Sequence, residues 1–265
     1  MKRFYVVGNP INHSLSPKLF TYIFNKLNID AEYLSYMPDS LNALQYFLKN
    51  KRNTFHGLNI TLPYKIDIFN CINKHDALSA KIKSTNCINN NNNQLMGYNT
   101  DYYGFTKMFD KTNINNVDIL ILGNGGLART VAYSLLDSTD NRVYVWGRNK
   151  KNVEFFINSI NSDRLLLYSK KLSSPYITIN CLPFNMVEND INEIIDNIFS
   201  SQIELFVDLN YMETLFTKTL TDKKYDVILG LDMFIFQALK SFDIWFDNKH
   251  HNKISYKEIQ ALLNK

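Results

Sequence analysis

A glycine-rich turn between an apolar strand and a helix most restricts how this 265-residue chain can fold. The run 119–122 is apolar, and Gly123, Gly125 and Ala128 then satisfy the pattern G-x-G-x-x-G/A. In this pattern the glycines allow a tight turn and a close approach to a pyrophosphate, and the third small residue lets the helix pack on the strand. Because a helix amino terminus also offers N–H groups to phosphates, the turn predicts a dinucleotide site. A purely structural turn is the alternative.

The loop after the following strand indicates which dinucleotide fits. A NAD site usually has Asp or Glu about 20 residues further on, where it bonds the ribose 2′-hydroxyl. Residues 146–151 of this chain contain no acidic residue, but they contain Arg148, Lys150 and Lys151. A guanidinium binds a phosphate through two parallel hydrogen bonds. The loop therefore predicts NADP(H), and a solvated basic loop is the alternative.

Strand and helix patterns alternate along the chain, which is typical of parallel sheets with crossover helices. We predict an α/β fold of two α/β domains with a cleft between them. The first is a substrate-binding domain with a mostly parallel sheet at 1–100, completed by C-terminal helices at 236–265. The second is a Rossmann NADP-binding domain at 101–235.

Composition excludes several classes of partner. The net charge is only +4 and no block of Lys or Arg stands out, so nucleic acid is not indicated. No apolar run approaches the roughly 20 residues of a membrane helix. Three scattered cysteines without a CxxC pair argue against disulfides and a metal site, and fit a reducing cytosol. We expect a cytoplasmic monomer or homodimer that binds small molecules and no metal.

The stretch 57–65 places polar groups where the third predicted strand meets a helix. Asn59 and Thr61 leave the strand end, Pro63 suits the first turn of a helix, and Lys65 falls inside that turn. Ligands of α/β proteins bind where strands end and helices begin. Taken alone, the stretch is better explained by a strand, a loop and a helix with a solvated lysine.

Other polar side chains stand at predicted helix starts or on apolar faces. Ser16 precedes Pro17 and suits a helix cap, whereas Ser14 does not, and two hydroxyls beside a helix start suit a carboxylate. Asp101 is of a type that caps helices. Gln237 lies in a largely apolar helix, where its amide needs a protein or ligand partner.

These stretches together resemble the shikimate dehydrogenase family over nearly the whole chain. The similar segments are GNPINHSLSP at 8–17, GLNITLPYK at 57–65, Asn86, GYNTDYYGF at 97–105, the glycine turn with Arg148, DLNY at 208–211, and GLDM at 230–233 with Gln237 four residues on. The resemblance implies reversible NADPH-dependent reduction of 3-dehydroshikimate to shikimate, in the chorismate pathway to aromatic amino acids.

The resemblance also implies roles for individual residues. Lys65 would donate the proton, with Asp101 orienting it and bonding a ring hydroxyl. The substrate would contact Ser14, Ser16, Asn59, Thr61, Asn86, Tyr211 and Gln237, the two serines at its carboxylate. The cofactor would contact Gly123, Asn124, Gly125, Gly126, Leu127, Arg148, Asn149, Lys151, Leu209, Gly230 and Met233.

Several residues depart from the family pattern and keep two alternatives open. Phe20 and Thr21 stand in place of a His-Asn pair, Cys87 in place of a Thr, and the loop 180–186 retains little of its usual sequence. One alternative is a quinate/shikimate dehydrogenase. The other is a non-catalytic NADP-binding sensor on the same scaffold, and the retained lysine–aspartate pair counts against it.

Overall fold

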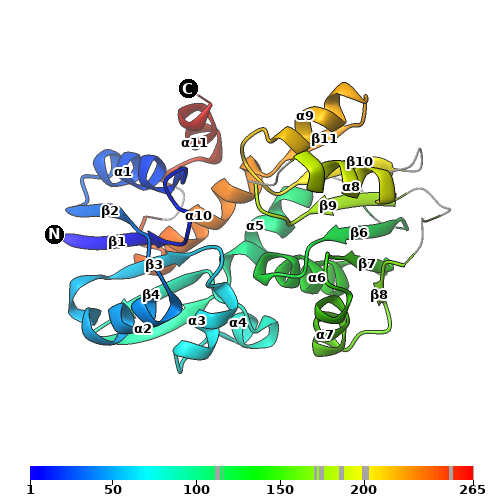
Figure 1. Cartoon of the computed structure of the whole chain (residues 1–265). Coiled ribbons are helices and arrows are strands. Elements are labelled where there is room, and N and C mark those ends of the chain that lie inside the picture. Colours follow the sequence, from blue (N-terminus) through cyan, green and yellow to red (C-terminus); the bar gives the residue numbers. More distant parts are fainter. Residues whose placement is uncertain are drawn as a thin grey trace. The chain divides into compact units, whose positions relative to one another are not determined.

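The computed structural model of the chain describes residues 1–110, 114, 116–169, 172, 176–184, 188–198, 203–250 and 253–264 (Figure 1). The chain divides into two compact units. Unit 1 comprises Met1–Gly104 and Ile235–Lys265, and unit 2 comprises Phe105–Phe234. The C-terminal segment therefore returns to the unit in which the chain begins. None of the helices in the described ranges is long and apolar enough to cross a membrane.

Unit 1 is built on a five-stranded sheet with the order β2-β1-β3-β4-β5. The strands are β1 (Lys2–Val7), β2 (Ala31–Tyr36), β3 (Gly57–Ile60), β4 (Cys87–Asn91) and β5 (Gln94–Tyr98). β1 pairs in parallel with β2 and β3, whereas β4 runs antiparallel to both β3 and β5. Asn92 and Asn93 turn the β4–β5 hairpin, and both have the positive φ that asparagine tolerates.

Helices cover both faces of this sheet, because successive side chains of a strand point to opposite sides. The helices are α1 (Ser16–Lys26), α2 (Leu41–Asn50), the 3-10 helix η1 (Arg52–Thr54), α3 (Lys65–Cys71), α4 (Ala77–Ile82), α5 (Thr100–Phe109), α10 (Leu231–Trp245) and α11 (Tyr256–Leu263). The Tyr5 ring meets Phe47 of α2 at 5.8 Å. The ring of the preceding residue, Phe4, instead packs against Phe24 of α1 and Trp245 of α10, with distances between ring centroids of 5.5 Å and 4.7 Å.

Unit 2 contains a six-stranded sheet with the order β11-β10-β9-β6-β7-β8. Its strands are β6 (Asp118–Leu122), β7 (Val143–Trp146), β8 (Leu165–Leu167), β9 (Tyr176–Asn180), β10 (Ile203–Asp208) and β11 (Val227–Leu229), and its helices are α6 (Gly126–Ser138), α7 (Lys150–Ile160), α8 (Glu188–Ile198) and α9 (Leu215–Asp222). Every pairing is parallel, and reading from β8 gives the Rossmann order 3-2-1-4-5-6. The predicted α/β class is confirmed.

Three predicted helix starts were wrong in detail. Ser16 is the first residue of α1 and not its cap; instead Ser14 Oγ accepts a hydrogen bond from the Ser16 N–H at 3.3 Å. Pro63 lies in the turn before α3, so Lys65 itself begins that helix. Likewise Asp101 lies inside α5, which starts at the residue before it. Each helix starts one or two residues from the position that residue type alone suggested.

Helix α9 begins without a familiar sequence signal for a helix start. It has only eight residues, and its apolar face is short. A capping box fixes its start: Thr214 Oγ1 accepts from the Thr217 N–H at 3.2 Å, and Thr217 Oγ1 accepts from the Thr214 N–H at 2.8 Å. Because the usual partner in this motif is Glu or Gln, the threonine pair does not match the familiar sequence signature.

Candidate active site

Lys65 and Asp101 form a shielded ion pair in unit 1. Lys65 Nζ lies 2.6 Å from Asp101 Oδ2, and the two side chains are only 14% and 8% exposed. Lys65 begins α3 just beyond the end of β3, and Asp101 lies in the first turn of α5. An ion pair with so little solvent is held more firmly than one at the surface. The ammonium group is therefore fixed beside a carboxylate.

The loops that follow β1 and β3 are bonded to each other beside this pair. The Thr61 N–H donates to Val7 O at 2.9 Å, and the Asn9 N–H donates to Leu62 O at 2.9 Å. The two backbones are so close that a Cβ on Gly8 would lie 2.4 Å from Thr61 Cγ2. Glycine is therefore required for this contact. The contact holds Thr61 and the segment leading to Ser14 at the carboxyl ends of β1 and β3.

Ser16 and Asn59 meet at a buried tyrosine. Ser16 is 5% exposed and Asn59 7%. Tyr33 Oη donates to Asn59 Oδ1 at 2.8 Å. Burial raises the pKa of Tyr33 well above its usual value, although a hydrogen bond with Ser16 acts in the opposite sense. The phenol is therefore neutral at ordinary pH and connects two of the predicted substrate residues.

The predicted substrate amides Asn86 and Gln237 approach each other through buried hydroxyl groups. Asn86 Nδ2 lies 2.9 Å from Thr100 Oγ1 and 3.5 Å from Gln237 Oε1. Thr100 in turn lies 3.1 Å from Ser241, measured between the two Oγ atoms. Sequence reasoning missed Thr100 and Ser241, although Thr100 precedes Asp101 and Ser241 follows Gln237 by one helical turn.

Asn59 differs from the other predicted substrate residues because protein groups bond both ends of its amide. Its Oδ1 accepts from Tyr33, and its Nδ2 donates to Ser241 Oγ at 2.9 Å. The side chain is thus integrated into the interior of unit 1. A direct contact between Asn59 and the substrate stays a prediction.

The glycine turn in unit 2 has the form that a pyrophosphate requires. Gly123 has φ +106°, a conformation that favours glycine, and its N–H donates to Trp146 O at 2.8 Å. A Cβ on Gly125 would meet no atom within 4 Å in the described structure, so this position opens to free space. Gly126 and Leu127 begin α6, and no side chain among the described residues caps it. The predicted turn residues, with Asn124 between the glycines, fit a dinucleotide phosphate group.

The basic loop after β7 is exposed on the surface of unit 2. Arg148, Asn149 and Lys151 all lie at exposed positions. Asn149 also has a structural task, because its Oδ1 caps α7 by accepting from the Asn152 N–H at 3.1 Å. Arg148 and Lys151 thus stand at the carboxyl end of the strand that follows the glycine turn, as an NADP site requires.

The remaining predicted cofactor residues of unit 2 are closely packed. A Cβ on Gly230 would lie 2.4 Å from Leu209 O, so only glycine fits against that backbone. Met233 is 3% exposed and belongs to the hydrophobic core of the unit. Tyr211, the one predicted substrate residue in unit 2, packs its ring against Phe234 at 4.6 Å.

The buried side chain of Asp208 ends β10 and accepts hydrogen bonds from neighbouring loops of unit 2. Burial raises the pKa of Asp208 to about 6, against the effect of hydrogen bonds from Asn210, Asn180 and Thr214. Its Oδ1 accepts from Asn210 Nδ2 at 2.7 Å and from Asn180 Nδ2 at 3.1 Å. Asn180 starts the altered loop 180–186, of which residues 185 and 186 lie outside the described residues.

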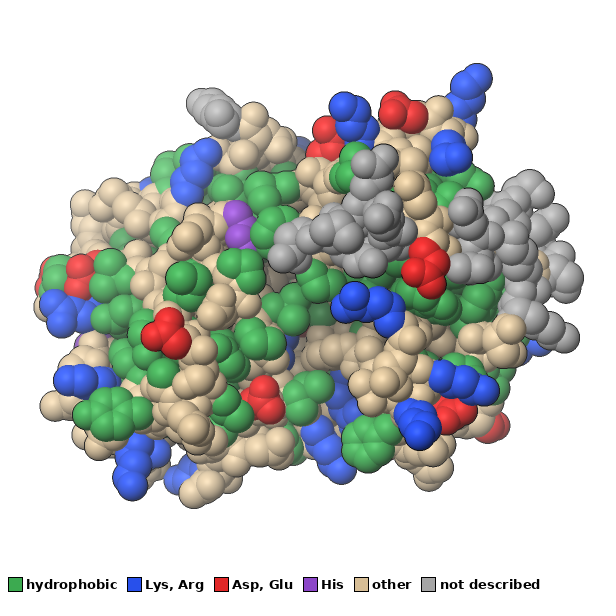
Figure 2. Space-filling view, in the orientation of Figure 1, with side chains coloured by type: hydrophobic (Ala, Val, Ile, Leu, Met, Phe, Trp, Pro, Cys, Tyr) green, Lys and Arg blue, Asp and Glu red, His purple; other side chains and the backbone are tan. Residues whose placement is uncertain are grey.

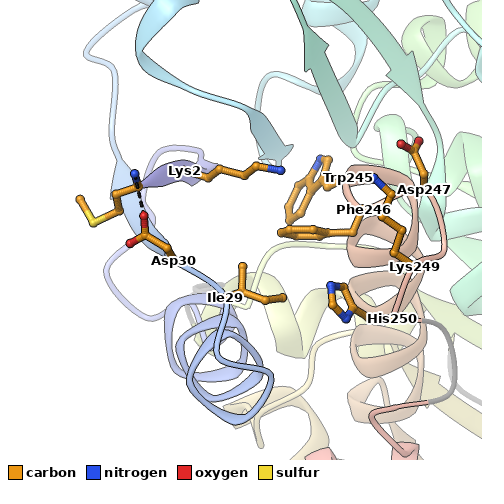
Figure 3. Close-up of a pocket in the computed structure, with 9 residues that line it drawn as sticks. Lys2, Ile29, Asp30, Trp245, Phe246, Asp247, Lys249 and His250 are labelled. Carbon is orange, nitrogen blue, oxygen red and sulfur yellow. Dashed lines mark ion pairs between the residues drawn. The ribbon is translucent and has the colours of Figure 1, made fainter.

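A cavity of about 500 Å³ in unit 1 lies at the opposite ends of the strands, their amino ends (Figure 3). It is lined by Met1, Lys2, Ile29, Asp30, Trp245, Phe246, Asp247, Lys249 and His250. Lys2 begins β1 and Asp30 precedes β2, so this cavity opens at the amino ends of the strands. It is therefore separate from the candidate site, which gathers at the carboxyl ends of β1 and β3.

Neither the charges on the face shown in Figure 2 nor the metal-binding groups of the described residues offer a competing site. Among the described residues visible in Figure 2, Lys and Arg side chains are scattered among acidic and uncharged ones. Within the described ranges no group of three or more His, Cys, Asp or Glu side chains could hold a metal ion. The polar constellations around Lys65 and at the glycine turn are the candidates for function.

Comparison with known proteins places both constellations in one family. A family profile described as the shikimate dehydrogenase substrate binding domain matches residues 6–88. The chain is 31% identical over 266 residues to a shikimate dehydrogenase (NADP(+)) of Clostridium beijerinckii, covering 96% of each chain. It is 30% identical to the enzyme of the same name from Thermoplasma acidophilum, over 97% of this chain and 95% of that one.

A solved structure supports the same relationship. Shikimate dehydrogenase 1 from Peptoclostridium difficile superposes with a TM-score of 0.80 at 27% identity. The match covers 100% of this chain and 97% of that one. Both units are therefore included in the similarity, and the sequence-based resemblance is confirmed.

Proposed function

This chain belongs to the shikimate dehydrogenase family, and on that premise we propose that it catalyses the reversible NADPH-dependent reduction of 3-dehydroshikimate to shikimate. The observation that carries the proposal is the ion pair between Lys65 and Asp101, 2.6 Å apart and largely shielded. It lies in unit 1, and Lys65 falls within the segment that matches the family's substrate-binding domain.

The reaction adds a hydride to a ring carbonyl carbon and a proton to its oxygen. NADPH, when bound, supplies the hydride. The Lys65 ammonium stabilises the negative charge that develops on the oxygen and then donates the proton to it. Asp101 directs the Lys65 ammonium, since its carboxylate accepts the ammonium hydrogen bond. In the reverse direction the neutral Lys65 amine takes the proton from the ring hydroxyl.

The substrate groups are assigned to side chains around this pair. Ser14 and Ser16 at the start of α1 bind the carboxylate, because hydroxyl groups and a helix amino terminus both suit an anion. Thr61, Asn86 and Gln237 bind ring hydroxyls. Asn59 is assigned to the substrate as well.

The cofactor groups are assigned to unit 2. The turn from Gly123 to Leu127 receives the pyrophosphate, and Arg148, aided by Lys151, receives the 2′-phosphate. The other assigned contacts are Asn149, Leu209, Gly230 and Met233. The open space at the Gly125 Cβ position supports this assignment, because a side chain there would occupy the approach to the phosphates.

Absorbance at the NADPH band tests the proposal directly. The purified chain is assayed with shikimate and then quinate, each with NADP⁺ and with NAD⁺. We expect NADPH to form with shikimate, and the rate with NAD⁺ to be lower because residues 146–151 lack an acidic ribose ligand. Faster turnover of quinate would favour a quinate/shikimate dehydrogenase. NADPH binding without turnover of either compound would favour a sensor.

We also propose a cytosolic location, which is supported by three cysteines that are all free thiols. The sequence leaves a monomer or a homodimer open. Size-exclusion chromatography with light scattering across a range of concentrations would distinguish the two states.

A further inference from the structure

The buried hydroxyl groups of Thr100 and Ser241 contact each other and the residues that carry the proposed substrate amides. Thr100 is 1% exposed and Ser241 is 0% exposed, and the reaction chemistry assigns a role to neither. We propose that Thr100 and Ser241 are positioning residues, whose hydroxyls fix the amide orientations of Asn86 and Gln237. The inference rests on the proposed function, because it concerns how the same site presents hydrogen-bonding atoms to a polyhydroxylated ring.

Thr100 holds both ends of the Asn86 amide. The Thr100 N–H donates to Asn86 Oδ1 at 2.6 Å, while Asn86 Nδ2 donates to Thr100 Oγ1 at 2.9 Å. Rotating the amide by half a turn would bring its NH₂ group against the Thr100 N–H, which places two donors together. Because both residues are buried, water cannot compensate for that clash. Asn86 is thereby restricted to one orientation.

Gln237 is oriented through Asn86, which Thr100 holds in place. Its Oε1 lies 3.4 Å from Thr100 Oγ1 and 3.5 Å from Asn86 Nδ2. Asn86 Nδ2 can donate to an oxygen, so it favours Oε1 on its side of the Gln237 amide. The Nε2 atom therefore lies on the other side. Gln237 then meets an oxygen of the substrate as a hydrogen-bond donor.

Ser241 contacts Thr100 through its side-chain hydroxyl group. Its Oγ accepts from Asn59 Nδ2 at 2.9 Å, lies 3.1 Å from Thr100 Oγ1, and donates to Gln237 O at 3.0 Å. One proton arrangement satisfies these groups: Asn86 donates to Thr100, Thr100 donates to Ser241, and Ser241 donates to the helix carbonyl. A buried network satisfied in this way is rigid, and rigid neighbours hold binding groups in a productive orientation.

Thr100→Val and Thr100→Ser form a matched pair for testing this proposal. Valine keeps the shape but removes the hydroxyl, whereas serine keeps the hydroxyl. We expect Thr100→Val to raise the KM for shikimate about tenfold, because it leaves buried amide groups without a hydrogen-bonding partner. The KM for NADP⁺ should stay within about twofold, and Thr100→Ser should stay close to wild type. Equal effects of valine and serine, or no effect of valine, would overturn the proposal.

A second variant and a direct probe keep the test decisive. Ser241→Ala should raise the same KM, and combining it with Thr100→Val should give less than the product of the two effects, because both disrupt one network. The side-chain amide NMR signals of Asn86 and Gln237 should shift in Thr100→Val and not in Thr100→Ser. Unmoved signals would refute the orienting role, even if the wild-type chain proved inactive with shikimate. Inactivity with shifted signals would instead refute only the proposed function.

Discussion

Replacing Lys65 with methionine removes the ammonium group while keeping an unbranched side chain of similar length. The pair it breaks is 2.6 Å long, with side chains 14% and 8% exposed. The variant therefore lacks the proposed proton donor, and it also leaves the Asp101 carboxylate in a poorly hydrated place without its cation. The two losses affect different measurable quantities.

The magnitudes follow from the surroundings of the pair. A positioned acid contributes about 10²- to 10⁴-fold to a proton-transfer step, so kcat should fall at least about a hundredfold. The KM for shikimate should change by less than about tenfold, because the groups assigned to its carboxylate and ring hydroxyls remain. Removing one partner of a buried pair costs about 3–5 kcal/mol of stability. Because both side chains retain some exposure, the expected loss is about 2 kcal/mol.

The double variant Lys65→Met/Asp101→Asn is the matched control. It removes both charges, so the free energy of unfolding in urea should return toward the wild-type value while kcat stays low. Steady-state rates with shikimate and NADP⁺ measure the first quantity, and urea titrations of the three proteins measure the second. If Lys65→Met raised KM a hundredfold but left kcat within tenfold of wild type, Lys65 would bind substrate and not transfer the proton.

Three further changes test other parts of the molecule. Arg148→Ala should raise the KM for NADPH about tenfold or more and leave that for NADH unchanged; initial rates that give the same ratio as wild type would contradict the 2′-phosphate assignment. Burial raises the pKa of Asp208 from 3.8 to about 6, so this carboxyl stabilises the fold below about pH 4, and about 3 kcal/mol is lost as the pH rises through 6. Asp208→Asn should remove that fall from the unfolding free energy, and parallel pH curves for the two proteins would show otherwise. Gly57→Ala would place a Cβ 2.4 Å from Trp245 Nε1, which donates to Ile88 O, and should cost about 1–3 kcal/mol in urea unfolding; an unchanged midpoint would mean that the indole can move away.

The fold could be predicted because its signals are local. Apolar strands alternate with amphipathic helices, and the turn at Gly123 needs a conformation that favours glycine, with φ +106°. Helix starts were less predictable, since Ser14 and not Ser16 accepts the hydrogen bond at the start of α1. Several residue types cap helices equally well, and the geometry of the incoming loop decides which one does so.

The hydrogen-bond network that joins Asn59, Thr100 and Ser241 to the proposed substrate amides could not be predicted for a different reason. Its bonds join residues that lie far apart in the sequence, such as Asn59 with Ser241 and Thr100 with Ser241. A serine on a helix more often points to solvent or bonds its own backbone, so its type carries no signal about a distant threonine. Only the packing of α10 against the sheet of unit 1 turns these hydroxyls into partners.

The proposed catalytic pair follows from one feature of topology, the antiparallel hairpin beside the parallel strands of unit 1. Because β4 runs antiparallel to β3, it starts where β3 ends, and the Ile60 N–H donates to Asn86 O at 2.8 Å. Strand β5 then runs back and ends close to the end of β3, where the Asn86 N–H donates to Tyr98 O at 3.1 Å. Helix α5 must begin there as well, which brings Asp101 to Lys65 across 36 residues of sequence. A parallel crossover at this point would have carried the chain's next helix start away from the lysine, so the hairpin is what makes the two motifs one site.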